Sequence, residues 1–139
     1  MWKDFSCYII NNYSDADKIV EVGVGNFVKV AHTLRRYLNK DIIMTDIKPY
    51  HKEIIVDDIT KPDLKLYEGT ALIYSIRPPA ELHPYLVDLA IKINSDLIIK
   101  HLSTEFININ KISLKKYENK NEFKLINYKK ASFYKMCCK

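Results

Sequence analysis

The chain has 139 residues, of which 47% are hydrophobic and 28% charged, with a formal net charge of +5. This length supports one continuous hydrophobic core and excludes a cofactor domain followed by a separate substrate domain, so we expect a single domain over residues 1–139. No apolar stretch approaches the ~20 residues of a membrane span, and the N-terminus lacks a secretory signal pattern, which predicts a cytoplasmic protein without membrane association.

Five short apolar runs, rich in β-branched residues, predict the strands. They occupy residues 19–22, 42–44, 54–56, 71–74 and 97–99. Each run is nearly continuous rather than alternating, which is typical of parallel strands buried on both faces.

Helical periodicity appears between some of these runs. Apolar residues recur at helical spacing over residues 27–38 and again over residues 82–93, where Pro78 and Pro79 suit the entry to a helix. A shorter helix is predicted over residues 4–12. The remaining connections are short and interrupted by prolines, so we expect no full helix there.

The C-terminal part has a different pattern. Residues 124–129 and 131–136 read as two strands, and Ile112 and Leu114 also alternate with polar residues. The whole pattern predicts an α/β fold: a Rossmann-like three-layer sandwich with a mostly parallel sheet of order 3-2-1-4-5 and antiparallel C-terminal strands at one edge.

The positive charge is concentrated at the end of the chain. Residues 111–139 contain nine lysines and two glutamates, a net charge of +7, so residues 1–110 carry −2. Such a segment occurs in RNA-binding proteins and also as an ordinary solvated surface, and charge alone favours the solvated surface. Cys137 and Cys138 are adjacent and have no zinc-type spacing with other ligands, so we expect free thiols and no metal site.

The glycines are concentrated in one turn. The chain has three glycines, and two of them, Gly23 and Gly25, lie between the first strand and the first helix, followed by Asn26. Glycine lets the backbone bend sharply and approach a ligand closely, and the helix N-terminus offers free N–H groups. The turn therefore predicts a site for a nucleotide-like ligand, with a tight turn that binds nothing as the alternative. Val28 occupies the place of the third glycine of a dinucleotide-binding turn, which disfavours NAD.

An acidic residue ends the second predicted strand. Asp46 lies 21 positions after Gly25, where nucleotide-binding folds of this class place an acid whose carboxylate accepts hydrogen bonds from ribose hydroxyls. We expect Asp46 to bind a ribose, and a surface aspartate that closes the strand is the alternative.

The end of the fourth strand should face the glycine turn. In the order 3-2-1-4-5 the topological switch lies between the first and fourth strands, and ligands bind outside the carboxyl ends of these strands. Ser75, Arg77 and Pro78 lie there and are candidates for binding a substrate. Arg77 has the fork geometry that grips a carboxylate or phosphate, and a solvent-exposed pair with Glu81 is the alternative.

Several stretches carry a family resemblance: residues 20–25, 45–47, 56–60 and 71–79. The acid-x-Gly-x-Gly pattern that begins at Glu21 resembles the first motif of S-adenosylmethionine-dependent methyltransferases, with Phe27 in place of their usual third glycine. Together these stretches resemble a small uncharacterised archaeal protein family with a Rossmann-like, methyltransferase-type fold.

The resemblance implies S-adenosylmethionine as the ligand and methyl transfer as the reaction. It implies that Glu21 belongs to the cofactor site, and that Asp57 or Asp58 meets the adenine amino group; the sequence does not choose between these two acids. Residues 77–79 are similar to a motif that orients a target amine, but the guanidinium of Arg77 cannot accept a hydrogen bond from an amine. Methylation of an amino group by that route is therefore disfavoured.

Two other functions stay open at the level of the sequence. One is an NAD- or adenine-nucleotide-binding regulatory domain. The other is a non-enzymatic module that binds RNA or a protein through the basic C-terminal strands. One scaffold hosts many chemistries, so the fold alone does not decide among them.

Overall fold

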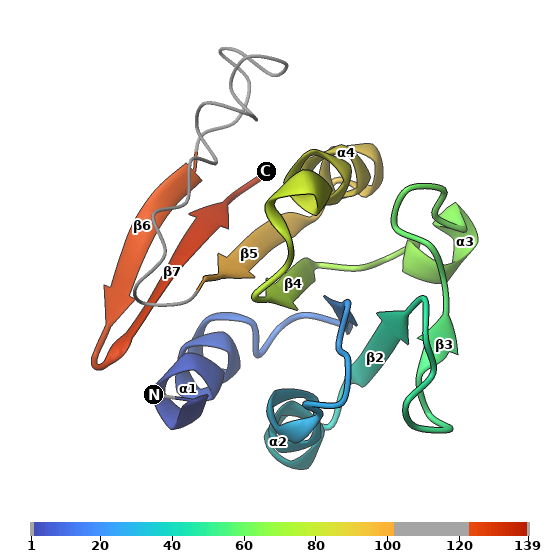
Figure 1. Cartoon of the computed structure of the whole chain (residues 1–139). Helices are drawn as coiled ribbons and strands as arrows, with labels where there is room; N and C mark the ends of the chain where they lie inside the picture. Colours follow the sequence, from blue (N-terminus) through green and yellow to red (C-terminus); the bar gives the residue numbers. More distant parts are fainter. Residues whose placement is uncertain (1, 102–122, 139) are drawn as a thin grey trace.

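The computed structural model describes residues 2–101 and 123–138. Its centre is a seven-stranded sheet of order β3-β2-β1-β4-β5-β7-β6 (Figure 1). The strands are β1 (Lys18–Val22), β2 (Asp41–Asp46), β3 (Ile55–Val56), β4 (Leu72–Ile76), β5 (Asp96–Lys100), β6 (Phe123–Tyr128) and β7 (Ala131–Met136). The helices are α1 (Trp2–Asn12), α2 (Lys29–Leu38), α3 (Leu64–Tyr67) and α4 (His83–Ile93), with a 3₁₀ turn, η1 (Ala80–Leu82), before α4.

The strand directions confirm the predicted fold class. β1 to β5 are mutually parallel in the order 3-2-1-4-5. β7 then pairs antiparallel with β5, and β6 pairs antiparallel with β7 at the sheet edge. The C-terminal hairpin therefore extends the parallel sheet. The predicted alternation at Ile112 and Leu114 lies outside the described residues.

Helices cover both faces of the sheet and bury its apolar side chains. α1 and α2 lie on one face and α3 and α4 on the other (Figure 1). Ile19 of β1 packs in the core beneath α1 and α2, and the next residue, Val20, packs in the core beneath α3 and α4. This alternation within one strand explains why the strands of the sheet read as continuous apolar runs.

The predicted helices are present with small changes at their ends. α1 begins at Trp2, two residues earlier than predicted, and buries Phe5 and Ile9. α4 begins after the 3₁₀ turn that follows Pro79, rather than directly after the prolines. As expected, the connection from β2 to β3 contains no helix, and α3 between β3 and β4 has only 4 residues. Within the described ranges, no helix is long and apolar enough to cross a membrane.

The C-terminal hairpin is attached to α1. The side chain of Asp4 accepts a hydrogen bond of 3.1 Å from the backbone N–H of Lys130 at the hairpin turn. Lys135 donates to the Tyr8 hydroxyl at 2.9 Å, and its ammonium lies 5.2 Å and 5.0 Å from the ring centres of Tyr8 and Tyr13. Lys135, one of the lysines in the basic C-terminal segment, is therefore half-buried against two tyrosine rings, where cation–π contacts stabilise it.

Candidate functional site

The glycine turn follows β1 at the topological switch between β1 and β4. Gly23 and Gly25 have φ angles of +71° and +59°, in the left-handed region that side chains with a Cβ rarely adopt. The carbonyl of Thr45 in β2 accepts the N–H groups of Gly23 and Val24 at 2.9 Å and 3.2 Å. The turn is thus held against the end of β2, with the exposed Asn26 at its tip.

Asp46 fixes the same turn with its carboxylate. Oδ2 accepts the N–H of Gly25 at 2.7 Å, and Oδ1 accepts the N–H of Lys48 at 3.1 Å. A carboxylate has about four lone-pair sites, so each oxygen retains acceptor capacity for a further donor. The spacing of 21 residues recognised in the sequence therefore corresponds to a direct contact between the two elements.

Glu21 is fully buried on the sheet face that α1 and α2 cover. Its exposed fraction is 0%, and its carboxyl group interacts with the buried Tyr74 hydroxyl. Burial raises the pKa of this carboxyl to about 8, and the Tyr74 hydroxyl, which lies nearby on β4, opposes that shift. Glu21 is therefore largely protonated at neutral pH.

The two adjacent aspartates after β3 have different roles. Asp57 is half-buried and accepts the Tyr67 hydroxyl at 2.6 Å and the N–H of Asp63 at 3.1 Å. Asp58 accepts both the N–H and the hydroxyl of Thr60, and these bonds lower its pKa. Asp58 thus closes the local turn, and Asp57 is the acid whose carboxylate meets the side chain of Tyr67.

Ser75 connects β4 to the glycine turn. Its buried hydroxyl donates to the carbonyl of Val22 at 2.8 Å. A Cβ placed on Gly23 would lie 3.8 Å from the same hydroxyl oxygen, whereas a Cβ on Gly25 would have no neighbouring atom within 4 Å. The end of β4 therefore does face the turn, as the strand order predicts, and the space beside Gly25 is open.

Arg77 stands in a strained backbone conformation at the end of β4. Its φ angle is 52°, a region that costs a non-glycine residue about 1–2 kcal/mol, and its N–H donates to the Lys100 carbonyl at 2.7 Å. Pro78 follows it and is half-buried. No ion pair joins Arg77 to Glu81 among the described residues; the guanidinium carbon instead lies 5.5 Å from the centre of the Trp2 ring.

Trp2 of α1 contacts both the glycine turn and the segment that follows β4. Its ring centre lies 4.9 Å from that of Phe27 in the glycine turn, and the guanidinium of Arg77, which follows β4, lies over the ring. Sequence patterns gave no indication of this role, because Trp2 lies far from both partners in the chain. The side chains of Trp2, Phe27 and Arg77 form a cation–aromatic wall, which we call the Trp2 wall.

Lys100, at the end of β5, is a buried cation close to the exposed Arg77. The Lys100 side chain is buried, and its Nζ donates to the carbonyl of His101 at 2.9 Å. Burial, together with the charge of Arg77, lowers the Lys100 pKa. The carboxyl ends of β4 and β5 are therefore electropositive, while the ends of β2 and β3 carry acids.

The strand order, with its topological switch between β1 and β4, defines a Rossmann-like fold. Solved structures with this fold include the delta-N METTL16 MTase domain, with a TM-score of 0.68 at 7% identity, covering 97% of this chain and 80% of that chain. Cofactor-bound Rv0187 from MTB has a TM-score of 0.67 at 13% identity, covering 97% and 78%. At sequence identities this low, the similarity shows a shared fold and nothing more.

The chain belongs to the uncharacterised protein family UPF0146, whose family model matches residues 2–137. The UPF0146 protein of Methanothermobacter thermautotrophicus is 42% identical over 134 residues, which cover 96% of this chain and 93% of that protein. The UPF0146 protein of Archaeoglobus fulgidus is 39% identical over 131 residues, covering 91% and 88%. These matches confirm the resemblance to an archaeal family with a methyltransferase-type fold.

Proposed function

We propose that the open space beside Gly25, which we call the crevice, binds S-adenosylmethionine and that the protein uses it as a methyl donor. The observation that carries this proposal is the contact between Gly25 and Asp46. It places a glycine turn with an open side next to a carboxylate with unused acceptor capacity, at the topological switch of the sheet. This arrangement suits an adenosine ribose.

The residues around the turn fit the remaining parts of that ligand. Ile47 follows Asp46 and is 61% exposed, so it offers an apolar surface to a purine beside the ribose site. Asp57 is the acid that suits the adenine amino group, because its carboxylate is a hydrogen-bond acceptor at the end of the next strand. Gly23, Gly25, Asn26, Asp46 and Asp57 would therefore hold the cofactor, while the fully buried Glu21 would lie behind the turn without touching the cofactor.

The opposite side of the crevice suits the substrate. When bound, S-adenosylmethionine supplies a methyl group on a positively charged sulfur, so the protein's task is mainly to position the acceptor. The guanidinium of Arg77 has the geometry to orient a carboxylate or phosphate of the substrate. Ser75 and Pro78 fix the backbone on either side of it.

Calorimetric titration of the purified protein with S-adenosylmethionine, S-adenosylhomocysteine, NADH and ATP tests the proposal. We expect the two adenosyl-sulfur ligands to bind, and Asp46→Ala to weaken them at least tenfold because the ribose loses its acceptor. Asp57→Asn should also weaken binding. The adjacent Asp58→Asn is the matched control and should leave binding unchanged.

The proposal fails if S-adenosylmethionine does not bind, or if its affinity is the same in Asp46→Ala. Binding of NADH without S-adenosylmethionine would favour the dinucleotide-binding regulatory domain. Circular dichroism of each variant establishes that a loss of binding is not a loss of folding.

A further inference from the structure

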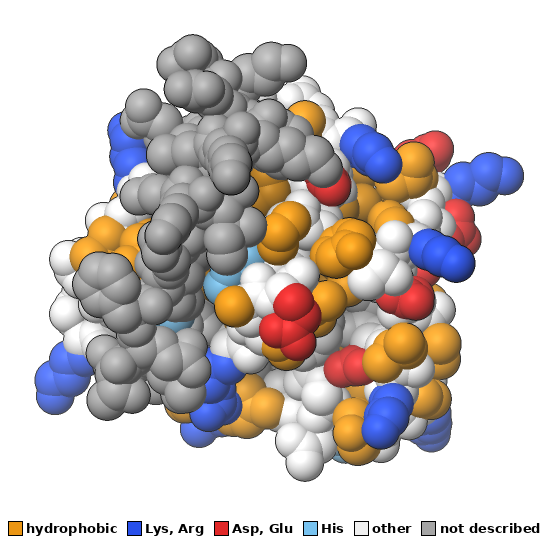
Figure 2. Space-filling model, turned by 45° about the horizontal axis from the view of Figure 1, so that its top comes forward, with side chains coloured by type: hydrophobic (Ala, Val, Ile, Leu, Met, Phe, Trp, Pro, Cys, Tyr) orange, Lys and Arg blue, Asp and Glu red, His pale blue; other side chains and the backbone are white. Residues whose placement is uncertain are grey.

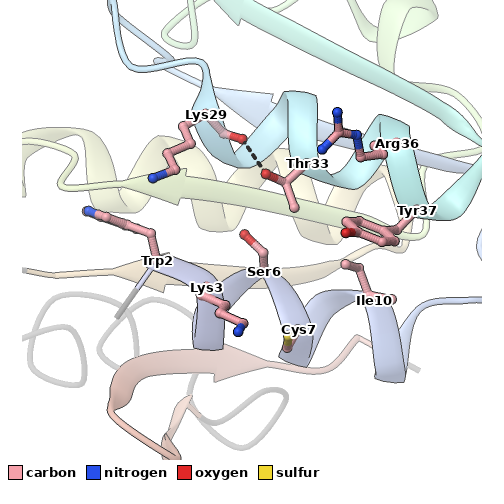
Figure 3. A pocket seen from close by; sticks show the side chains of 9 residues that line it. All are labelled: Trp2, Lys3, Ser6, Cys7, Ile10, Lys29, Thr33, Arg36 and Tyr37. Carbon is pink, nitrogen blue, oxygen red and sulfur yellow. Dashed lines mark hydrogen bonds between the residues drawn. The ribbon is translucent and has the colours of Figure 1, made fainter.

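A groove lies between α1 and α2, on the outer side of the helical layer (Figure 3). Its volume is about 580 Å³, which is within the range of ligand-binding pockets. Trp2 and Lys29 lie at one end and Tyr37 at the other, with Thr33 between them (Figure 3). None of the residues proposed to hold the cofactor lines this groove. Trp2, which does line it, contacts Phe27 of the glycine turn.

The lining of the groove is positively charged. Lys3, Lys29 and Arg36 are exposed, and none of the nine lining residues is acidic. Within the described part of the chain, these three cations make no ion pair. The nearby acids point elsewhere: Asp4 binds the C-terminal hairpin, and Glu53 pairs with His32 and Arg35.

The groove differs in this respect from other parts of the surface. On the face that Figure 2 shows, with the α4 side of the molecule turned forward, both acidic and basic side chains are present outside the grey region. A concave surface lined by one sign of charge attracts ligands of the opposite sign. The charge of the groove therefore favours anionic ligands.

The groove also offers an aromatic surface. Tyr37 is 65% exposed, an unusual position for a large ring on a helix that buries its other apolar residues. From Lys29 to Tyr37 the helix rises ~12 Å at 1.5 Å per residue. That length matches about three to four stacked nucleotides at ~3.4 Å each.

From the charge, the exposed ring and the length, we infer that this groove binds a short stretch of single-stranded nucleic acid. Lys3, Lys29 and Arg36 neutralise the phosphates, and a base stacks on Tyr37. Stacking on an aromatic ring combined with a cationic track is the arrangement by which proteins bind single strands. The site is separate from the basic C-terminal strands and does not depend on cofactor binding.

Fluorescence anisotropy with labelled eight-nucleotide RNA and DNA strands of the same sequence tests this inference. The full-length protein is compared with Lys29→Gln/Arg36→Gln, in which two phosphate contacts are removed. The matched control is Lys61→Gln/Lys65→Gln, which removes the same charge from exposed positions near α3. The chain has one tryptophan, Trp2, which lines the groove, so its fluorescence gives a second readout of binding. Because Trp2 also contacts Phe27 and Arg77, the variants establish which site is occupied.

We expect binding of one or both strands with quenching of Trp2 fluorescence. The groove variant should lose at least tenfold in affinity, and its slope of log affinity against log salt should fall by about 1.4, or about 0.7 for each phosphate contact removed. The affinity of the control should change less than twofold. Tyr37→Ala should weaken binding about fivefold without changing the salt slope.

Three results would overturn the inference. They are the absence of binding to either strand, equal losses in the groove and control variants, and a loss confined to Lys124→Gln/Lys130→Gln in the C-terminal hairpin. Asp46→Ala should bind the strands like the unmodified protein. The strand-binding hypothesis and the cofactor-binding hypothesis can therefore fail independently of each other.

Discussion

The backbone N–H of Gly25 donates a 2.7 Å hydrogen bond to Oδ2 of Asp46 and so connects the turn after β1 with the end of β2. The second oxygen of the same carboxylate accepts the N–H of Lys48. One side chain thus holds two backbone segments in place at the mouth of the crevice. Asp46 has a structural role whether or not a ligand is bound.

This double contact predicts different effects for two substitutions of Asp46. Asp46→Ala leaves two N–H groups without their acceptor and should lower the free energy of unfolding by about 1–3 kcal/mol. Asp46→Asn keeps one acceptor oxygen and should cost less than about 1 kcal/mol. Urea denaturation measures both values. Equal stabilities of the two variants would show that the hydrogen bonds do not hold the turn.

Burial of Glu21 predicts a pH-dependent stability. Its pKa of about 8 in the folded state lies above the ordinary value of 4.5, so folding favours the protonated form. The stabilisation is complete below about pH 4.5 and falls as pH rises towards 8, by at most about 1.4 kcal/mol per pH unit. Glu21→Gln keeps the shape and removes the proton equilibrium. Relative to the unmodified protein, the variant should become more stable as pH rises from 5 to 8. Thermal midpoints measured against pH test this, and midpoints that change in parallel for the two proteins would contradict the account.

The left-handed conformation of Arg77 predicts an unusual ranking of two substitutions. Both Arg77→Ala and Arg77→Gly remove the guanidinium and its contact with Trp2, but glycine adopts a φ of 52° without the penalty that alanine incurs. The glycine variant should be more stable than the alanine variant by about 1 kcal/mol. Differential scanning calorimetry measures the difference. A more stable alanine variant would mean that the backbone relaxes there.

The packing of Lys135 predicts that two lysines of the basic segment differ in importance. Lys135→Met removes the hydrogen bond to Tyr8 and the contacts with two tyrosine rings, and should destabilise the fold by about 1–2 kcal/mol. Lys124→Met, at the paired position on exposed β6, should change stability by less than about 0.5 kcal/mol. Chemical denaturation measures the free energy of unfolding of both variants. Equal losses would contradict a stabilising role of the Lys135 contacts.

Much of the fold was predictable because it depends on local periodicity. The continuous apolar runs specified five strands, and the stripes of residues 27–38 and 82–93 specified the two longer connecting helices. The order of the two C-terminal strands was not predictable, because either strand of a hairpin can pair with the sheet edge. β7 takes the inner place, and it buries Ala131 and Phe133 while Leu125 of β6 is 52% exposed.

The candidate site was predictable only in part. The glycine turn and Asp46 are recognisable from spacing along the chain, and the structure brings them into contact. The sequence could not show that Asp57 and Asp58 have different partners, because the contact of Asp57 depends on where Tyr67 lies in three dimensions. No sequence pattern predicted the Trp2 wall, because its three residues come from α1, the glycine turn and the segment after β4, which are far apart in the chain.

The most direct test of the central claim is hydrogen–deuterium exchange with and without saturating S-adenosylmethionine. A ligand in the crevice should slow exchange at the amides of residues 23–28 and 46–48, which include the Gly25 and Lys48 N–H groups held by Asp46. Exchange in the hairpin turn of residues 128–131 should be unchanged. Protection of the glycine turn would place the cofactor where we propose, and unchanged exchange there would contradict the proposal.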